Sequence, residues 1–219
     1  MDLDKETLIL SDDKIFYTIE GEGEYVGQRS LFMRMAMCNL TCIGFASEDS
    51  PHGCDSFISW SVKNKMTFNE IFKMMEDNNW IEKLEKGTIW KLTGGEPLIQ
   101  QKQLEFNATF TTSPKLTTNG DPEEKTYKPE VLKYHREIGS GFKFVINDPA
   151  EDIKEIWRKY VEDKNGINIT QDRIWFMPVA GSRKEHIENA AAVVEYAKSM
   201  HVNFSSRLHL LVWDMALKV

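Results

Sequence analysis

The sequence has few cysteines, no long apolar run and no excess of basic charge. All three cysteines lie between positions 38 and 54, whereas a disulfide framework uses an even number spread along the chain. No apolar run approaches the roughly 20 residues that cross a bilayer, and the acidic start MDLDKETLIL does not fit a signal peptide. We therefore expect a cytoplasmic protein with no membrane partner.

Acidic residues outnumber basic ones. The 27 lysines and arginines stand against 34 aspartates and glutamates, which gives a formal charge of −7. A phosphate backbone is held by a surplus of basic residues that release its counterions, so we expect no nucleic-acid partner. The length of 219 residues suits one domain, and because no linker or repeat interrupts the chain, we predict a single domain over residues 1–219.

Strand-like and helix-like segments alternate along the chain. The expected strands are 30–37, 88–93, 141–146, 173–179 and 207–213, and the expected helices are 67–85, 129–138, 149–164 and 182–200. Capping boxes begin two of these helices, at Thr67 and Ser182. This alternation predicts an α/β fold with a mostly parallel sheet. Because a complete eightfold barrel takes about 250 residues, we expect a partial (β/α) barrel.

The cysteines form one cluster. Cys38 and Cys42 are a C-x3-C pair, and eleven residues separate Cys42 from Cys54. Three thiolates from one loop suit a four-iron cluster in which one iron lacks a protein ligand. The residues alone leave two alternatives, a structural zinc with His52 as fourth ligand and three unpaired core cysteines.

A second loop, Thr93-Gly94-Gly95-Glu96-Pro97, follows the expected strand 88–93. Glycines permit close contact with a ligand, and the neighbouring carboxylate suits a cationic amine, although an ordinary strand-to-helix turn has the same composition. Ligands bind at the carboxyl ends of parallel strands. We therefore expect this loop and the cysteine loop at the same edge of the sheet.

Arg34 is a single charge within the apolar strand 30–37. Its planar guanidinium suits a carboxylate-bearing ligand. The alternative is an internal ion pair with Glu20 or Glu22, since buried arginines are usually paired.

These motifs together resemble the 7-carboxy-7-deazaguanine synthase (QueE) family of radical S-adenosylmethionine (AdoMet) enzymes. Residues 16–23, FYTIEGEG, resemble the family's opening FxTxQGEG, with Glu20 where Gln is usual. The other matching segments are TGGEP at 93–97, SPK at 113–115 and SRLH at 206–209. The superfamily's C-x3-C-x2-C pattern is altered, because Phe45 holds the usual third position and Cys54-Asp55-Ser56 resembles the closing Cys-Asp-Thr after an insertion.

The resemblance implies a partial barrel of the radical AdoMet type and a lyase of queuosine and deazapurine biosynthesis. The implied reaction converts 6-carboxy-5,6,7,8-tetrahydropterin to 7-carboxy-7-deazaguanine with loss of ammonia. The implied cofactors are a [4Fe-4S] cluster, AdoMet and Mg²⁺. The implied partners are the small-molecule pterin, an electron donor such as flavodoxin, and a second copy of the chain in a homodimer.

The resemblance also assigns residues. Cys38, Cys42 and Cys54 are expected to ligate the cluster, and Ser56 to hold Mg²⁺. The residues expected to bind AdoMet are Gly94, Gly95, Glu96, Ser113, Pro114 and Lys115. The residues expected to bind the pterin are Ile19, Glu20, Gly21, Glu22, Arg34, Thr93 and Val219.

Two rival functions stay open. A glycyl-radical activating enzyme would lack the GEG and RLH segments, and a zinc-stabilised binding module would make TGGEP and SPK coincidences. The chain is also short between Pro97 and Ser113, where 15 residues replace the family's usual helix and strand. Either a helix or strand has been lost between Pro97 and Ser113, or the sequence omits residues from this segment.

Overall fold

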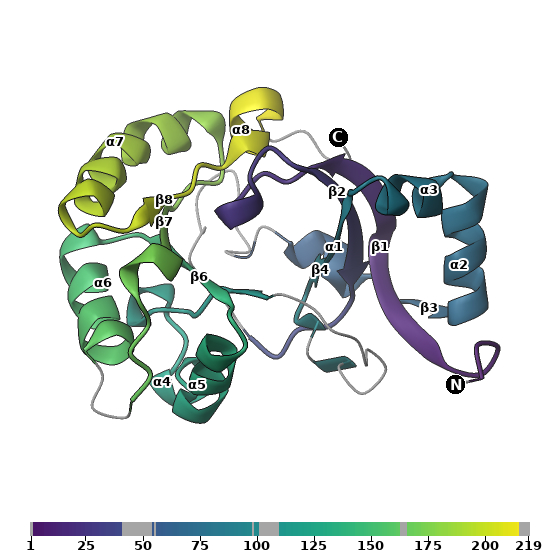
Figure 1. Cartoon of the computed structure of the whole chain (residues 1–219), viewed down its shortest axis with the longest axis horizontal. Helices are drawn as coiled ribbons and strands as arrows, with labels where there is room; N and C mark the ends of the chain where they lie inside the picture. The colour runs from purple at the N-terminus through teal and green to yellow at the C-terminus, as the bar shows by residue number, and fades with distance from the viewer. Residues whose placement is uncertain are drawn as a thin grey trace.

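The computed structural model describes residues 2–40, 54, 56–97, 99–100, 110–162 and 166–214, which form two four-stranded sheets. Sheet A has the order β3-β1-β2-β4, and sheet B the order β5-β6-β7-β8. The strands are β1 Thr7–Ile19, β2 Arg29–Met35, β3 Asn64–Thr67, β4 Ile89–Gly94, β5 Thr111–Thr112, β6 Gly141–Ile146, β7 Ile174–Pro178 and β8 Asn203–Phe204. The two sheets occupy opposite halves of the molecule (Figure 1).

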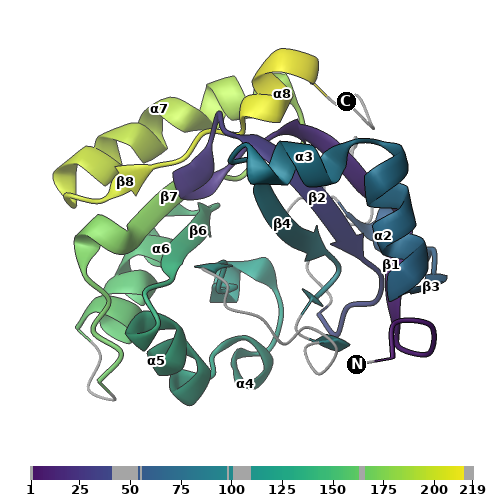
Figure 2. The ribbon, with the colours of Figure 1, turned by 45° about the vertical axis from the view of Figure 1, so that its right-hand side comes forward.

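Helices cover the outer side of each sheet. The helices are α1 Phe57–Ser61, α2 Phe68–Asp77, α3 Trp80–Glu85, α4 Glu123–Thr126, α5 Pro129–Glu137, α6 Pro149–Ile156, α7 Arg183–Ser199 and α8 Leu208–Trp213. The short turns are η1 Gly23–Tyr25, η3 Thr117–Asn119, η4 Trp157–Val161 and η5 Gln171–Arg173. In Figure 2, α2 and α3 lie outside sheet A, and α5, α6 and α7 lie outside sheet B. Among the described helices, none has the length and apolar character needed to cross a membrane.

The two sheets differ in strand direction. Strand β1 pairs antiparallel with β2 and β3, whereas β2 and β4 are parallel. Every pair in sheet B is parallel. The α/β class is confirmed. The prediction of a mostly parallel sheet did not include β1, which makes both antiparallel pairs of sheet A. Residues 20–28 join β1 to β2 directly, and a link this short gives antiparallel strands because a parallel crossover needs a dozen or more residues.

Sheet A buries one face and keeps polar side chains on the other. On β2, Leu31, Met33 and Met35 are at most 2% exposed and belong to the core formed with α2. Because side chains alternate along a strand, Arg34 projects from the opposite, inner face. Thr93 of β4 lies directly beside Arg34 in the parallel register. The inner face of sheet A therefore carries two of the residues predicted to bind the pterin.

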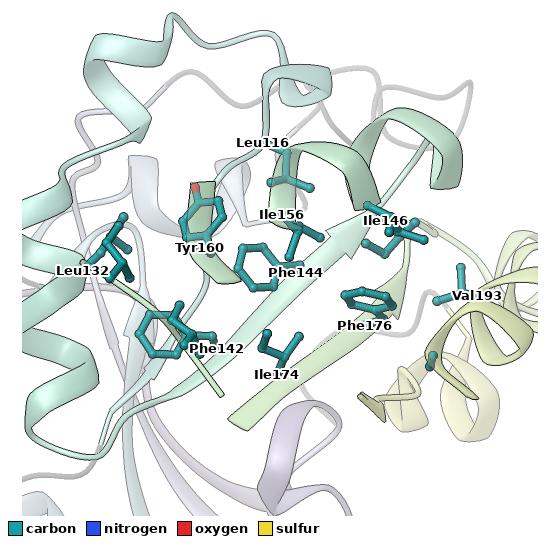
Figure 3. Packing of buried hydrophobic residues seen from close by; sticks show 14 residues of the cluster. Leu116, Leu132, Phe142, Phe144, Ile146, Ile156, Tyr160, Ile174, Phe176 and Val193 are labelled. Carbon is teal, nitrogen blue, oxygen red and sulfur yellow. The ribbon is translucent and has the colours of Figure 1, made fainter. Parts of the chain in front are cut away.

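Sheet B repeats this arrangement. Phe142, Phe144 and Ile146 project from one side of β6 into a second core, where Phe144 meets the ring of Tyr160 (Figure 3). The alternation places Lys143 on the other face of the strand. Both sheets thus turn their apolar sides toward the helices and their charged side chains inward.

Residues 67–85 form two helices rather than the single helix predicted. The capping box at Thr67 is present, and α2 begins directly after it. The chain then breaks at Asn79, whose φ of 55° is left-handed and cannot continue a right-handed helix. Similarly, the predicted helix 149–164 consists of α6 followed by one π-helical turn, η4.

Residues 207–213 were predicted as a strand, which was wrong. They form the cap and body of α8, and β8 supplies the edge of sheet B instead. Two of the last carbonyls of α8 accept from the Arg183 guanidinium, at 3.3 Å for Leu210 O and 3.1 Å for Val212 O. A short apolar run does not distinguish helix from strand, and this long-range cap favours the helix.

Candidate functional site

The glycine loop packs against the segment that leads into Cys38. The backbone N–H of Glu96 donates to Met37 O over 2.9 Å. A Cβ on Gly95 would lie 1.8 Å from the same Met37 oxygen, and Gly94 has a φ of +110°. Only glycine permits a contact this close and a backbone angle of this kind. The loop and the start of the cysteine segment therefore form one rigid unit at the carboxyl ends of β2 and β4.

Cys38 lies where three of the predicted segments meet. Burial raises the pKa of its thiol, and the charges of Glu96 and Cys54 raise it further, while the Leu40 N–H and Lys115 act in the opposite direction. Leu40 N donates to Cys38 Sγ over 3.5 Å. Cys38 and Cys54 are both half-buried and outside any disulfide. Cys38 thus lies within electrostatic reach of both Glu96 and Lys115, and its place beside TGGEP agrees with the prediction made from the positions of the two segments after strands.

Part of the predicted ligand set lies outside the described residues. Cys42 and Val219 belong to that part, as do His52 and Phe45. Within the described ranges, no group of three His, Cys or carboxylate side chains gathers around a metal-sized space. The described chain therefore supplies two thiols of the expected three.

Arg34 is held on the inner face of sheet A by contacts from two elements. Its guanidinium lies 5.2 Å from the centre of the Phe16 ring. Its Nη1 donates to Ser59 Oγ of α1 over 3.3 Å, and Ser59 Oγ donates to Ser11 Oγ over 3.3 Å. Ser56, the predicted Mg²⁺ ligand, is the N-terminal cap residue of the same helix. Helix α1 thus links Arg34 to the segment that follows Cys54.

Residues 20–22, here named the acidic loop, are held by cations from distant segments. Glu20 is 3% exposed; its Oε1 accepts the Glu22 N–H over 2.9 Å, and its Oε2 pairs with Lys91. Glu22 pairs with Lys143 through Oε2 and accepts from Arg207 Nε over 2.8 Å through Oε1. Other cations therefore engage both carboxylates that the sequence suggested as partners of Arg34.

The cations around Glu22 decide its charge. Burial alone would raise the pKa of Glu22, but the charges of Lys143, Arg207 and His209 outweigh burial and hold the pKa well below its ordinary value. His209 Nε2 lies 3.9 Å from Glu22 Oε1. Glu22 is therefore ionised at neutral pH, so its carboxylate acts as a hydrogen-bond acceptor.

The acidic loop also contacts the SRLH segment at the far end of the chain. Leu208 N donates to Gly21 O over 2.9 Å, and Gly23 N donates to Ser205 Oγ over 2.6 Å. A Cβ on Gly21 would lie 2.3 Å from His209 Nδ1, so a larger residue would push the imidazole away. Figure 1 and Figure 2 show α8 beside the turn between β1 and β2. Two motifs more than 180 positions apart thus build one side of the site.

The sequence predicted no role for Lys91 or Lys143, and it singled out Arg207 only as part of the SRLH motif. A usable signal existed for the two lysines, because each is the single charge in an otherwise apolar strand. The same observation singled out Arg34. Gln100 was also missed: it is buried, and its amide exchanges hydrogen bonds with the Ile9 backbone over 2.7 and 2.9 Å.

Comparison with known proteins agrees with the motifs. No family model matches the sequence. A 7-carboxy-7-deazaguanine synthase from Hyperthermus butylicus is 28% identical over 233 residues, which cover 91% of each chain. A protein of the same name from Pyrobaculum aerophilum is 26% identical over 229 residues, covering 93% of this chain and 94% of that protein. This chain is therefore similar, over more than nine tenths of its length, to proteins named 7-carboxy-7-deazaguanine synthase.

The fold agrees with this similarity. The crystal structure of QueE from Escherichia coli superposes with a TM-score of 0.61 at 16% identity, covering 92% of this chain and 95% of that one. At this low identity the likeness establishes the fold, α/β with helices outside two sheets, and says nothing of individual side chains.

Gly95→Ala is expected to weaken AdoMet binding. The new methyl group meets Met37 O and forces the loop away from Cys38; overpacking of this kind costs about 1–3 kcal/mol, which is roughly tenfold in affinity. Equilibrium titration of the reconstituted protein with AdoMet measures the change. Gly87→Ala is the control for backbone strain alone, because Gly87 has a φ of +83° but its Cβ would meet nothing within 4 Å. Unchanged AdoMet affinity in Gly95→Ala would place the cofactor elsewhere.

Proposed function

We propose that this protein is a radical AdoMet lyase that converts 6-carboxy-5,6,7,8-tetrahydropterin to 7-carboxy-7-deazaguanine. The observation that carries the proposal is the contact of the TGGEP loop with the segment that leads into Cys38, in which the Glu96 N–H donates to Met37 O over 2.9 Å. Relatives named for this activity match more than nine tenths of the chain. The product serves queuosine and deazapurine biosynthesis.

The residues present suit a cluster and AdoMet. Cys38, Cys42 and Cys54 would hold a [4Fe-4S] cluster, because two of them lie together and all three belong to one loop. AdoMet would lie against the glycine loop, where a Cβ would fill the space beside Met37 O. The proposed AdoMet contacts are Gly94, Gly95, Glu96, Ser113, Pro114 and Lys115. When bound, these cofactors supply the radical that abstracts hydrogen from the substrate.

The inner faces of the two sheets would bind the pterin. Arg34 would clamp the substrate carboxylate with its planar fork, and the ionised Glu22 would accept hydrogen bonds from the pterin ring. The remaining proposed pterin contacts are Ile19, Glu20, Gly21, Thr93 and Val219. Enclosing the substrate between the sheets excludes water, which protects a reactive radical from side reactions.

We further propose a partial (β/α) barrel of the radical AdoMet type that works as a single domain over residues 1–219. Its support is that helices lie outside both sheets (Figure 2) and that an apolar core packs between each sheet and its helices. The proposal includes Mg²⁺ held with the help of Ser56, an electron donor such as flavodoxin, a homodimer and a cytoplasmic location.

Turnover by the purified protein tests this function. The protein is purified anaerobically, reconstituted with iron and sulfide, and incubated with AdoMet, Mg²⁺, dithionite and the tetrahydropterin. We expect a brown protein that forms 7-carboxy-7-deazaguanine, identified by mass spectrometry. AdoMet cleavage without a pterin product would favour an activating enzyme, and a colourless zinc protein would favour the binding module.

A further inference from the structure

Two lysines from different sheets reach the same three-residue acidic loop. Lys91 is the single charge on β4 of sheet A, and Lys143 is the single charge on β6 of sheet B. Lys91 pairs with Glu20, and Lys143 pairs with Glu22. The lysine side chains come from strands 52 positions apart yet end two residues from each other on one loop.

Both ion pairs are shielded from water. The side chains of Lys91 and Glu20 are 26% and 4% exposed, and those of Lys143 and Glu22 are 13% and 18% exposed. Salt screens such pairs much less than surface pairs. Removing one partner leaves the other charge with little solvent to replace it. These contacts therefore differ from the surface ion pairs of the chain, for which solvent is available.

The two pairs act on one backbone segment. Glu20 uses one carboxylate oxygen for Lys91 and the other for the Glu22 N–H, so both oxygens have donors within the protein. The Glu20 carboxylate therefore sets where the Glu22 backbone lies, and Lys143 together with Arg207 sets where the Glu22 side chain points. Arg207 also donates to Glu22, through Oε1 over 2.8 Å, so loss of Lys143 leaves one Glu22 oxygen with its cation and the other, Oε2, without its lysine.

We propose that Lys91 and Lys143 are positioning residues that fix the acidic loop between the two sheets so that Glu22 meets the pterin in one orientation. The proposal rests on the proposed function for the identity of the substrate. It changes the expected role of Glu20, whose carboxylate orients the loop through Lys91 and the Glu22 amide. Lys143 acts on the substrate through Glu22.

The first measurement needs no substrate. Hydrogen–deuterium exchange of residues 20–27 is followed in the reconstituted protein without AdoMet or pterin, for wild type, Lys91→Met and Lys143→Met. We expect about tenfold faster exchange in both variants, because the loop opens more readily when its cations are lost. Lys91→Arg and Lys143→Arg are expected to restore much of the protection.

Two surface lysines serve as matched controls. Lys86 is 66% exposed and pairs with Glu82, and Lys154 is 72% exposed and pairs with Glu151. Lys86→Met and Lys154→Met remove the same charge from the same kind of pair in water. We expect wild-type exchange of residues 20–27 in both controls.

The second measurement separates positioning from general stability. We expect Lys143→Met to raise KM for the pterin by about tenfold, while AdoMet cleavage without pterin stays at the wild-type rate. A purely structural lysine would lower the thermal midpoint without changing KM. Unchanged exchange of residues 20–27 in the lysine variants would overturn the proposal. So would an unchanged KM for the pterin in Lys143→Met, provided that the wild-type protein forms product. A wild type that forms no product would instead refute the proposed function, while the exchange measurement still decides the role of the lysines.

Discussion

Cys54→Ala is expected to abolish product formation and to leave the protein without an intact cluster. A [4Fe-4S] cluster of this type depends on three thiolates, and the variant retains only Cys38 and Cys42. Two ligands hold neither the charge nor the geometry that the cluster requires. Iron and sulfide content, the visible absorption of the reconstituted protein and AdoMet cleavage are measured on the same sample, and each is expected to fall to background.

Ser61→Ala is a suitable control for this variant, because Ser61 lies at the exposed end of α1, the helix that follows Cys54. It should keep full iron content and activity. If Cys54→Ala itself kept its iron and cleaved AdoMet, the late cysteine would not be a ligand. The insertion that displaces the usual third cysteine would then need another explanation.

Arg34→Lys is expected to weaken pterin binding severely while leaving the fold and the cluster intact. A lysine keeps the positive charge but loses the planar fork that binds a carboxylate through two hydrogen bonds. Truncating one partner of such a buried pair costs about 2–5 kcal/mol, which is roughly thirtyfold or more in affinity. Pterin affinity and the thermal midpoint are measured on the same sample.

Arg29→Lys is the matched control, because Arg29 begins the same strand and its Nη2 donates to the exposed carbonyl of Lys86 over 3.0 Å. We expect wild-type pterin affinity there. A lower thermal midpoint in Arg34→Lys with unchanged pterin affinity would show that Arg34 supports the contacts to Phe16 and Ser59 rather than the substrate.

The sequence predicted the features that depend on local periodicity. Short apolar runs identified β2 and β6 as strands, and the structure shows that one face of each packs against helices. The adjacency of the two loops was also predictable, since parallel strands end at one edge. The structure confirms it through the pairing of Met35 with Gly94. The direction of β1 and the helical state of 207–213 were not predictable, because connection geometry and a distant arginine decide them.

The partners of the acidic loop illustrate why the rest of the site was missed. Local reasoning offered an ion pair of Arg34 with Glu20 or Glu22 as the alternative to a substrate contact. In the fold, Glu22 instead meets Lys143 and Arg207, which lie 121 and 185 positions away. A single charge in an apolar strand signals that a partner exists. Which partner it is depends on how the two sheets face each other.

The two hydrophobic cores give the chain an order of assembly during synthesis. One core uses residues from positions 8–92, and the other uses residues from positions 116–204, so neither needs the other's sequence. Chains fold from the N-terminus as the ribosome releases them. The cysteines and the glycine loop are therefore made before Lys143 and Arg207, so the first core can form while the opposite wall of the site is still untranslated.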